Sequence, residues 1–162
     1  MSIVKPNNNT LSSITALPAA ISTGKVLQAV QGNHTSNAST SSTSFQDLST
    51  NTNVSITPSS SSNKILVLAH FNELFHNSGT NTTSHYIRVT ANGSEIHRAH
   101  TSYTEGLGGE ELWSYDLNSL HSPNTTSATT YQVYCRVQSA SYSGTFNHGN
   151  SKGTITAFEV AG

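Results

Sequence analysis

Residues 55–75, which read SITPSSSSNKILVLAHFNELF, decide the fold of this chain. A short strand ends at Pro58, a run of serines turns the chain, and an apolar segment over residues 64–75 follows. The β-branched and aromatic content of this segment, with turn chemistry on both sides, favours an extended strand over a helix. We therefore predict that residues 64–75 form the central strand of the core.

The central strand is predicted to change character along its length. Over residues 65–68 both faces of the pleat are apolar, as in a strand covered on both sides. Further on, Phe71 and Phe75 share one face of a regular strand, whereas polar residues such as His70 take the other. This pattern is typical of a strand that leaves the interior of a sandwich.

Short alternating segments separated by turn residues fill the rest of the chain. Strands are predicted over residues 25–31, 43–48, 54–57, 85–91, 94–100, 110–117, 129–139, 145–147 and 154–160, with a polar loop over residues 32–42. No segment resembles a crossover helix. The sequence therefore predicts an all-β protein, an antiparallel jelly-roll-like β-sandwich over residues 24–162 with a short extended N-terminal arm over residues 1–23.

Two local patterns are especially informative. Asn92 and Gly93 lie between alternating segments and suit a two-residue type I′ turn, which predicts that residues 94–100 pair back on residues 86–91. Residues 129–139 alternate between apolar and polar side chains. Cys135, the single cysteine, lies on their apolar face and is predicted to be a small buried side chain rather than a nucleophile.

Composition excludes several classes of protein. Only 33% of the 162 residues are hydrophobic and 9% are charged, so serine, threonine and asparagine supply the polarity. The seven lysines and arginines are dispersed along the sequence and the net charge is −1, which argues against a nucleic-acid partner. No apolar run of about eighteen residues and no secretory signal pattern occurs, so we expect a soluble protein without membrane insertion.

The sequence offers no catalytic motif. Eight histidines invite a metal site, but His97 and His100 are three residues apart in a predicted strand and point to opposite faces. Glu110 and Glu111 are adjacent and also diverge, and no framed nucleophile occurs. We predict no catalytic residue, no metal and no cofactor, hence a non-enzymatic protein, with a metal site built from separate loops left open as an alternative.

Aromatic residues provide an alternative function, the recognition of bacterial surface glycans. Aromatic rings stack on sugar rings, and neighbouring amides and hydroxyls read the sugar hydroxyls. The candidate contacts are Tyr103, Trp113, Tyr115 and Tyr142, with Tyr134 as a further aromatic on a strand face. Trp113 and Tyr115 also share a strand face with Leu117, so a place in the core is the competing interpretation.

The N-terminal arm spaces single apolar residues between polar ones. These residues are Ile3, Val4, Leu11, Ile14, Leu17, Pro18 and Ile21. A segment this short cannot bury them against itself, so they are expected to dock on the domain, on a sister subunit or on a larger assembly. A poorly ordered terminus fits the composition equally well.

Several segments in order resemble a known family. They are Leu17-Pro18, residues 23–28 (TGKVLQ), 41–45 (SSTSF), 54–67 (VSITPSSSSNKILV) and 153–161 (GTITAFEVA). Together they resemble short virion-associated proteins and fibre-tip β-domains of tailed bacteriophages of marine and aquatic bacteria. Residues 54–67 are the most specific part. The family carries no catalytic motif that could be transferred to this chain.

The resemblance implies a structural role on the surface of a phage particle, on the capsid or the tail, after synthesis in the cytoplasm of a bacterial host. Homotrimers are expected, because phage fibres and capsid-decorating proteins occupy threefold positions. The partners are then other virion proteins, with host surface glycans as the alternative. The doubly apolar stretches at residues 65–68 and 155–157 are expected to face both the core and a trimer seam formed by Ile65, Val67, Ile155 and Ala157.

Overall fold

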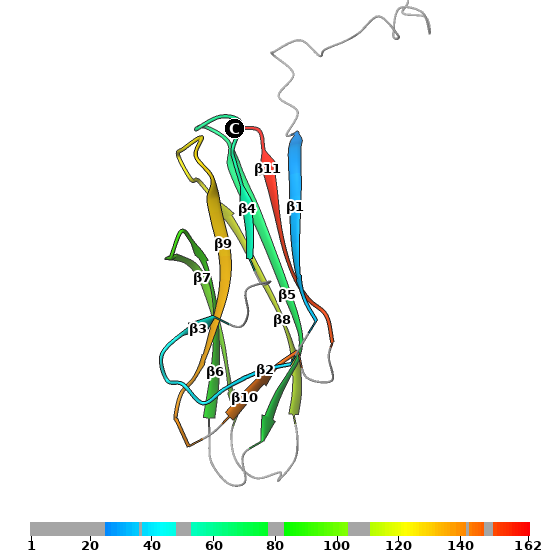
Figure 1. The fold of residues 1–162 in the computed structure, drawn as a ribbon, viewed down its shortest axis with the longest axis vertical. Helices are drawn as coiled ribbons and strands as arrows, with labels where there is room; N and C mark the ends of the chain where they lie inside the picture. Colours follow the sequence, from blue (N-terminus) through cyan, green and yellow to red (C-terminus); the bar gives the residue numbers. More distant parts are fainter. Residues whose placement is uncertain are drawn as a thin grey trace, which may run out of the picture.

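The computed structural model describes residues 25–35, 37–47, 53–77, 83–103, 111–141, 143–147 and 151–162. Within them the chain forms eleven strands (Figure 1), and none of these residues forms a helix that is long and apolar enough to span a membrane. The strands are β1 Val26–His34, β2 Ala38–Thr40, β3 Gln46–Asp47, β4 Asn53–Ile56, β5 Lys64–Asn77, β6 Thr83–Ala91, β7 Ser94–Tyr103, β8 Glu111–His121, β9 Thr129–Val137, β10 Ser143–Phe146 and β11 Gly153–Val160. The predicted arm at residues 1–23 lies outside the described residues.

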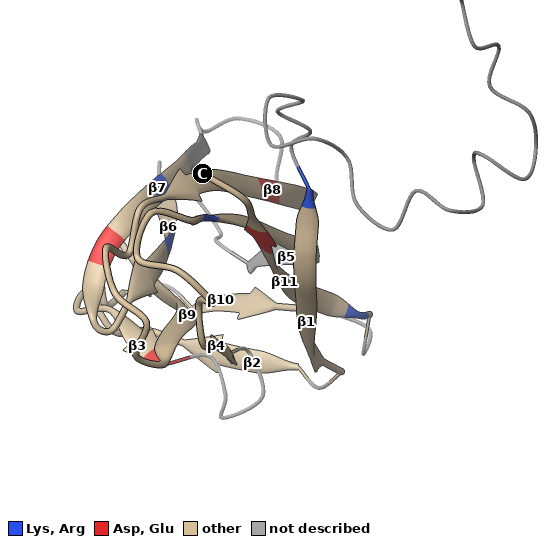
Figure 2. Ribbon diagram, turned by 90° about the horizontal axis from the view of Figure 1, so that it is seen from above, with Lys and Arg blue, Asp and Glu red and all other residues tan. Residues whose placement is uncertain are grey.

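The strands form two antiparallel sheets that enclose one interior, as the end-on view in Figure 2 shows. The first sheet has the order β1-β11-β5-β10-β2, with β8 on the other edge of β5, and the second has the order β3-β9-β6-β7, with β4 also paired to β9. The chain passes repeatedly from one sheet to the other, which gives a jelly-roll-like sandwich. The predicted fold class is confirmed.

Strand β5 is the central strand of the first sheet, as predicted. Ile65, Val67, Ala69 and Phe71 on its inner face are at most 2% exposed, because they pack against the second sheet. Removing such side chains from water contributes roughly 1.5–3 kcal/mol for each large one. Past Phe71 the register with β8 shifts by one residue at a bulge between Phe71 and Leu74.

The core continues across both sheets. Its largest fully buried side chains include Tyr131, Phe71, Phe146, Ile56, Ile65, Ile87, Leu117 and Ile155. The buried hydroxyl of Tyr131 on β9 has a hydrogen-bond partner, because its Oη lies 2.8 Å from His121 Nδ1 on β8. Cys135 is also buried in this core, as predicted, and burial raises the pKa of its thiol. The described residues contain no group of three or more potential metal ligands.

The predicted hairpin at Asn92-Gly93 is confirmed. Ala91 pairs with Ser94, and φ is 47° at Asn92 and 86° at Gly93, the positive values that this turn requires. Asn92 also fixes the turn to β9, because its Oδ1 accepts a hydrogen bond from the Thr130 amide at 2.8 Å. Its own amide donates to the Thr130 carbonyl at 2.8 Å.

The polar segment after β1 differs from the prediction. The expected loop at residues 32–42 contains the end of β1 and the strand β2 Ala38–Thr40. Of the expected strand at residues 43–48, the structure describes residues 43–47, and within these only Gln46–Asp47 is a strand. Strand β2 pairs with β10 through its backbone. Its residues AST carry little apolar signal, so only this long-range pairing makes them a strand.

A buried carboxylate joins two strands and the serine-rich turn at one end of the sandwich. Glu159 on β11 is fully buried and accepts hydrogen bonds from Gln28 Nε2 at 2.6 Å and Asn63 Nδ2 at 2.6 Å. The backbone amide and hydroxyl of Ser59 also donate to it, at 2.6 and 2.8 Å. These contacts fix the serine-rich turn between β4 and β5 against β1 and β11.

Burial disfavours the charge of Glu159, but the hydrogen bonds from Asn63, Gln28 and Ser59 outweigh it and lower the pKa to about 2. Gln28, the serine-rich turn and Glu159 come from three of the segments on which the family resemblance rests. Those segments therefore meet in one structural cluster, and their sequence pattern is explained by folding rather than by catalysis.

Candidate interaction surfaces

The outer face of the first sheet, which points away from the second sheet, carries a band of apolar side chains. Cross-strand pairing aligns Ala29 with Phe158, Phe158 with Leu66, and Leu66 with Leu120. This row therefore crosses β1, β11, β5 and β8 in order. Directly opposite side chains in antiparallel strands lie on the same face, so the row is continuous.

Neighbouring residues widen this band at both sides. Leu68 lies two residues further along β5, and Val26 pairs with Val160 at the other side of the row. Leu68, Leu120 and Val26 are 41%, 58% and 61% exposed. We call the outer apolar patch the set Val26, Leu66, Leu68, Leu120, Phe158 and Val160.

The outer apolar patch contains three of the four large hydrophobic side chains that are exposed in the described part of the chain. The fourth, Leu27, is 46% exposed and lies at the bulge next to Val26. Single exposed apolar residues are ordinary, whereas a contiguous group of them is a candidate interaction surface.

The residues that the sequence assigned to a trimer seam lie elsewhere. Ile65, Val67, Ile155 and Ala157 are at most 1% exposed and belong to the core between the sheets. That assignment is wrong, because a side chain without accessible surface cannot contact another subunit. Residues 65–68 are apolar on two faces, as the sequence indicated, and the outward face is carried by the alternate residues Leu66 and Leu68. The expectation is wrong for residues 155–157, because their outward residue is the polar Thr156.

A depression with a mixed apolar and polar lining borders the outer apolar patch. It is lined by Leu68, Ala69, His70, Asp116, Leu117, Asn118, Thr154 and Thr156. His70 Nδ1 lies 2.6 Å from Asp116 Oδ1 across β5 and β8, and Thr154 pairs with His70 from β11. The His70–Asp116 pair and neutral hydroxyl and amide groups form this border, and the exposed Lys64 lies at another edge of the patch, opposite Val160.

The outer face of the second sheet has a different character, because it gathers all three arginines of the chain. Arg88 on β6 pairs with Arg98 on β7 and with Tyr134 on β9. In the adjacent row Tyr86 pairs with Arg136. The basic residues are therefore dispersed along the sequence, as predicted, but the fold brings the three arginines together on one face.

Aromatic rings separate these guanidinium groups. The ring of Phe45, which precedes β3, has Arg88, Arg136 and Arg98 at 4.2, 5.3 and 5.4 Å from its centroid. Arg136 also lies 3.8 Å from the ring centroid of Tyr86. We call this group, completed by Tyr134 at 5.1 Å from Arg88, the arginine–aromatic surface.

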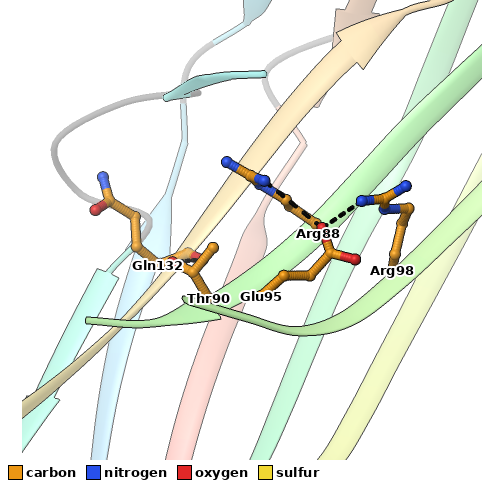
Figure 3. Close-up of polar contacts among 5 residues, drawn as sticks. All are labelled: Arg88, Thr90, Glu95, Arg98 and Gln132. Carbon is orange, nitrogen blue, oxygen red and sulfur yellow. Dashed lines mark hydrogen bonds and ion pairs between the residues drawn. The ribbon is translucent and has the colours of Figure 1, made fainter. Parts of the chain in front are cut away.

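One carboxylate already lies against this surface. Figure 3 shows Arg88 and Arg98 reaching the same carboxylate of Glu95. The distances are 2.6 Å from Arg98 Nη2 and 3.6 Å from Arg88 Nη1 to Glu95 Oε2. The hydrogen bond from Arg98 lowers the pKa of Glu95 against the opposing effect of burial, so this side chain is ionised at neutral pH.

Among the aromatic residues predicted to bind glycans, the structure tests only Tyr115. Tyr115 is only 8% exposed and belongs to the core, so its assignment to a glycan contact is wrong. Tyr103 and Trp113 lie on strands β7 and β8, but their side chains fall outside the description, as does Tyr142. Tyr134 lies on the outer face of the second sheet, within the arginine–aromatic surface.

No family model and no curated protein matches this sequence. Among solved structures, the chain is similar to VP2 of infectious bursal disease virus in a subviral particle, with 13% identity and a TM-score of 0.39 over 91% of this chain and 44% of that one. A mutant VP2 of the same virus, in derived T=1 particles, matches at 12% identity and a TM-score of 0.38 over 82% and 36%. This chain spans less than half the length of either protein, and likenesses at these TM-scores carry no argument about its function.

Proposed function

We propose that this chain is a non-enzymatic structural protein of a virus particle, a homotrimeric β-sandwich module attached to the capsid or tail through its N-terminal arm. The observation that carries the proposal is the outer apolar patch on the first sheet. The edge strand of this sheet, β1, begins directly after the arm. The sequence resemblance to virion-associated and fibre-tip domains supports a tailed bacteriophage as the proposed particle.

The outer apolar patch is proposed to pack against two further copies of this chain. Leu66, Leu68 and Phe158 carry no charge, and the lysine on this face, Lys64, lies at the edge of the patch opposite Val160. Burying such side chains between copies stabilises the assembly in the same way as burying them in a core. In a closed threefold arrangement each copy contacts both neighbours.

The place where the arm joins the domain favours the same arrangement. Val26 belongs both to the first residues of β1 and to the outer apolar patch, so residues 1–23 leave each domain next to the seam. An extended segment of this length reaches on the order of 75 Å, enough to contact a neighbouring virion subunit. Three arms that emerge together multiply a weak individual affinity.

The test uses particles and purified protein together. Peptides of this chain are expected in the mass spectrum of purified particles, in a fixed ratio to the major capsid or tail protein. A variant that lacks residues 1–23 is expected to keep its thermal unfolding transition and to lose association with particles. Absence of the chain from purified particles, or full association of the truncated variant, would overturn the proposal.

A further inference from the structure

We infer that the arginine–aromatic surface is a binding site for saccharides that carry carboxylates, such as the uronic-acid polymers of bacterial surfaces. This inference goes beyond the structural role, because it uses the opposite sheet and needs neither the trimer nor the arm. It also replaces the loop platform predicted from the sequence with a site on the strands β6, β7 and β9.

The guanidinium groups retain donors for a ligand. A guanidinium has five N–H donors in a planar fork that matches a carboxylate. Within the described residues Arg136 has no acidic partner and donates only to the Val137 carbonyl, at 3.3 Å. The Arg98 side chain is 47% exposed and uses one nitrogen for Glu95.

Glu95 demonstrates that the surface accepts a carboxylate. Its side chain receives a short contact from Arg98 and a longer one from Arg88, so two arginines converge on one anionic group. Arg88 Nε is buried and has no hydrogen-bond partner among the described residues. Arg98 and Arg136 both lie near the Phe45 ring, at 5.4 and 5.3 Å from its centroid, so a ligand carboxylate placed beside Glu95 has two further guanidinium groups close by.

The aromatic rings explain why the ligand is a sugar rather than a free anion. Tyr134 is half-buried on the same outer face as the arginines and is the ring offered to a sugar, whereas the Tyr86 ring already has Arg136 at 3.8 Å and His100 stacked on it at 5.5 Å with an interplanar angle of 20°. Sugar rings pack their C–H faces on such rings. The Gln132 side chain, which contacts Asp47 at 2.6 Å, supplies polar groups beside them.

The small net positive charge of the arginine–aromatic surface favours a ligand with few anionic groups. Three arginines face Glu95 and Asp47, so the local excess is a single positive charge. Nucleic acid binding relies on many cations that neutralise successive phosphates. A polymer with one carboxylate on each ring fits this surface better, because each arginine fork has one carboxylate to bind.

Titration calorimetry on the purified full chain tests the site, with oligogalacturonate, oligomannuronate and oligosialic acid as probes. Binding of at least one of the three is expected, and the fully methyl-esterified form of a bound uronate is expected not to bind, since it keeps the rings and removes the charge. Absence of binding for all three probes, or equal binding of the esterified form, would overturn the inference. Binding of dextran sulfate with equal affinity would also overturn it, because that indicates general charge attraction.

Variants separate a binding site from a merely structural arrangement of charges. Arg136→Gln is expected to weaken binding at least tenfold, and Arg136→Lys nearly as much because the planar fork is lost. Lys64→Gln removes the same charge from the first sheet and is expected to leave affinity within twofold. An unchanged affinity in Arg136→Gln, with an unchanged unfolding transition, contradicts the site.

Glu95→Gln provides a gain of function. It removes the internal carboxylate that competes for Arg88 and Arg98, so binding is expected to tighten several-fold. A purely structural ion pair predicts lower stability without tighter binding, and that result would count against the inference. Particle association is measured separately, so failure of this site leaves the proposed virion role intact and the reverse also holds.

Discussion

At the scale of single residues, Glu159 shows how this low-charge chain uses an ionised group. It lies where β1, β11 and the serine-rich turn meet, and it has hydrogen-bond donors from Gln28, Ser59 and Asn63. A buried carboxylate without such partners is strongly destabilising, whereas a fully hydrogen-bonded one fixes a unique arrangement. The serine-rich turn is therefore held in place by a residue about one hundred positions away.

The folded protein holds the pKa of Glu159 at about 2, below its ordinary value of 4.5. A lowered folded pKa gives stability that is fully present above about pH 4.5 and is lost as the pH falls toward 2. Glu159→Gln is expected to lose about 2–4 kcal/mol of unfolding free energy at pH 7 and to flatten the pH dependence between pH 5 and 2.

Urea unfolding at a series of pH values measures this effect. Asp116→Asn is a matched control, since it removes an exposed carboxylate from the same sheet. A Glu159→Gln variant with the same stability and the same pH profile as the unmodified chain would disprove the structural role of this carboxylate.

The Glu159 cluster could not be predicted from the sequence, although its residues stand in the segments that carry the family resemblance. The contact between Asn63 and Glu159 requires the register of β11 on β5, and local patterns do not specify that register. The Asn92-Gly93 turn was predicted because its signal is local: two adjacent residues tolerate positive φ.

Gly93 provides a second residue-scale prediction. With φ at 86° and no heavy atom within 4 Å of a Cβ placed there, Gly93→Ala adds backbone strain without a steric clash. The variant is expected to lose roughly 1 kcal/mol of unfolding free energy, measured by chemical denaturation. A loss of several kcal/mol would mean that the turn has contacts beyond its own backbone conformation.

At the scale of elements, alternation decides which residues of β5 face inward. The sequence indicated that residues 65–68 are apolar on both faces, and the structure places Leu66 and Leu68 outward and Ile65 and Val67 inward. Periodicity alone does not say which of two apolar faces meets the other sheet. Likewise, the pairing of Arg88 with Arg98 follows from the hairpin, but their proximity to Arg136 needs the non-local pairing of β6 with β9.

The outer apolar patch leads to a prediction at this scale. Leu120→Asp introduces a charge at a side chain that is 58% exposed, so the folded monomer loses little, whereas an interface between copies would bury an unpaired charge. Native mass spectrometry is expected to give a trimer for the unmodified chain and a monomer for this variant. Ser55→Asp on the exposed outer face of β4 is the control and is expected to remain a trimer.

Two outcomes of this experiment would contradict the proposed interface between copies of the chain. If Leu120→Asp stays trimeric, the outer apolar patch is not the surface between copies. If the unmodified chain is a monomer at micromolar concentration, the threefold arrangement itself is wrong. Circular dichroism on each variant distinguishes a change in assembly from a loss of fold.

At the scale of the whole molecule, the two sheets are proposed to divide two tasks between them. The first sheet has an apolar outer face and begins where the arm ends, whereas the second gathers the three arginines with aromatic rings. A trimer built through the first sheet leaves the second sheet facing outward. The proposed saccharide site would then be repeated three times on the surface of one module, which strengthens binding to a polymer.

A cryo-electron map of the particle that carries this protein tests the central claim most directly. The account predicts threefold density with the first sheet of each copy turned toward the axis, the second sheet turned outward, and residues 1–23 seated on a neighbouring capsid or tail subunit. A particle map without this density, or one in which the outer apolar patch faces solvent in separate monomers, would contradict the account.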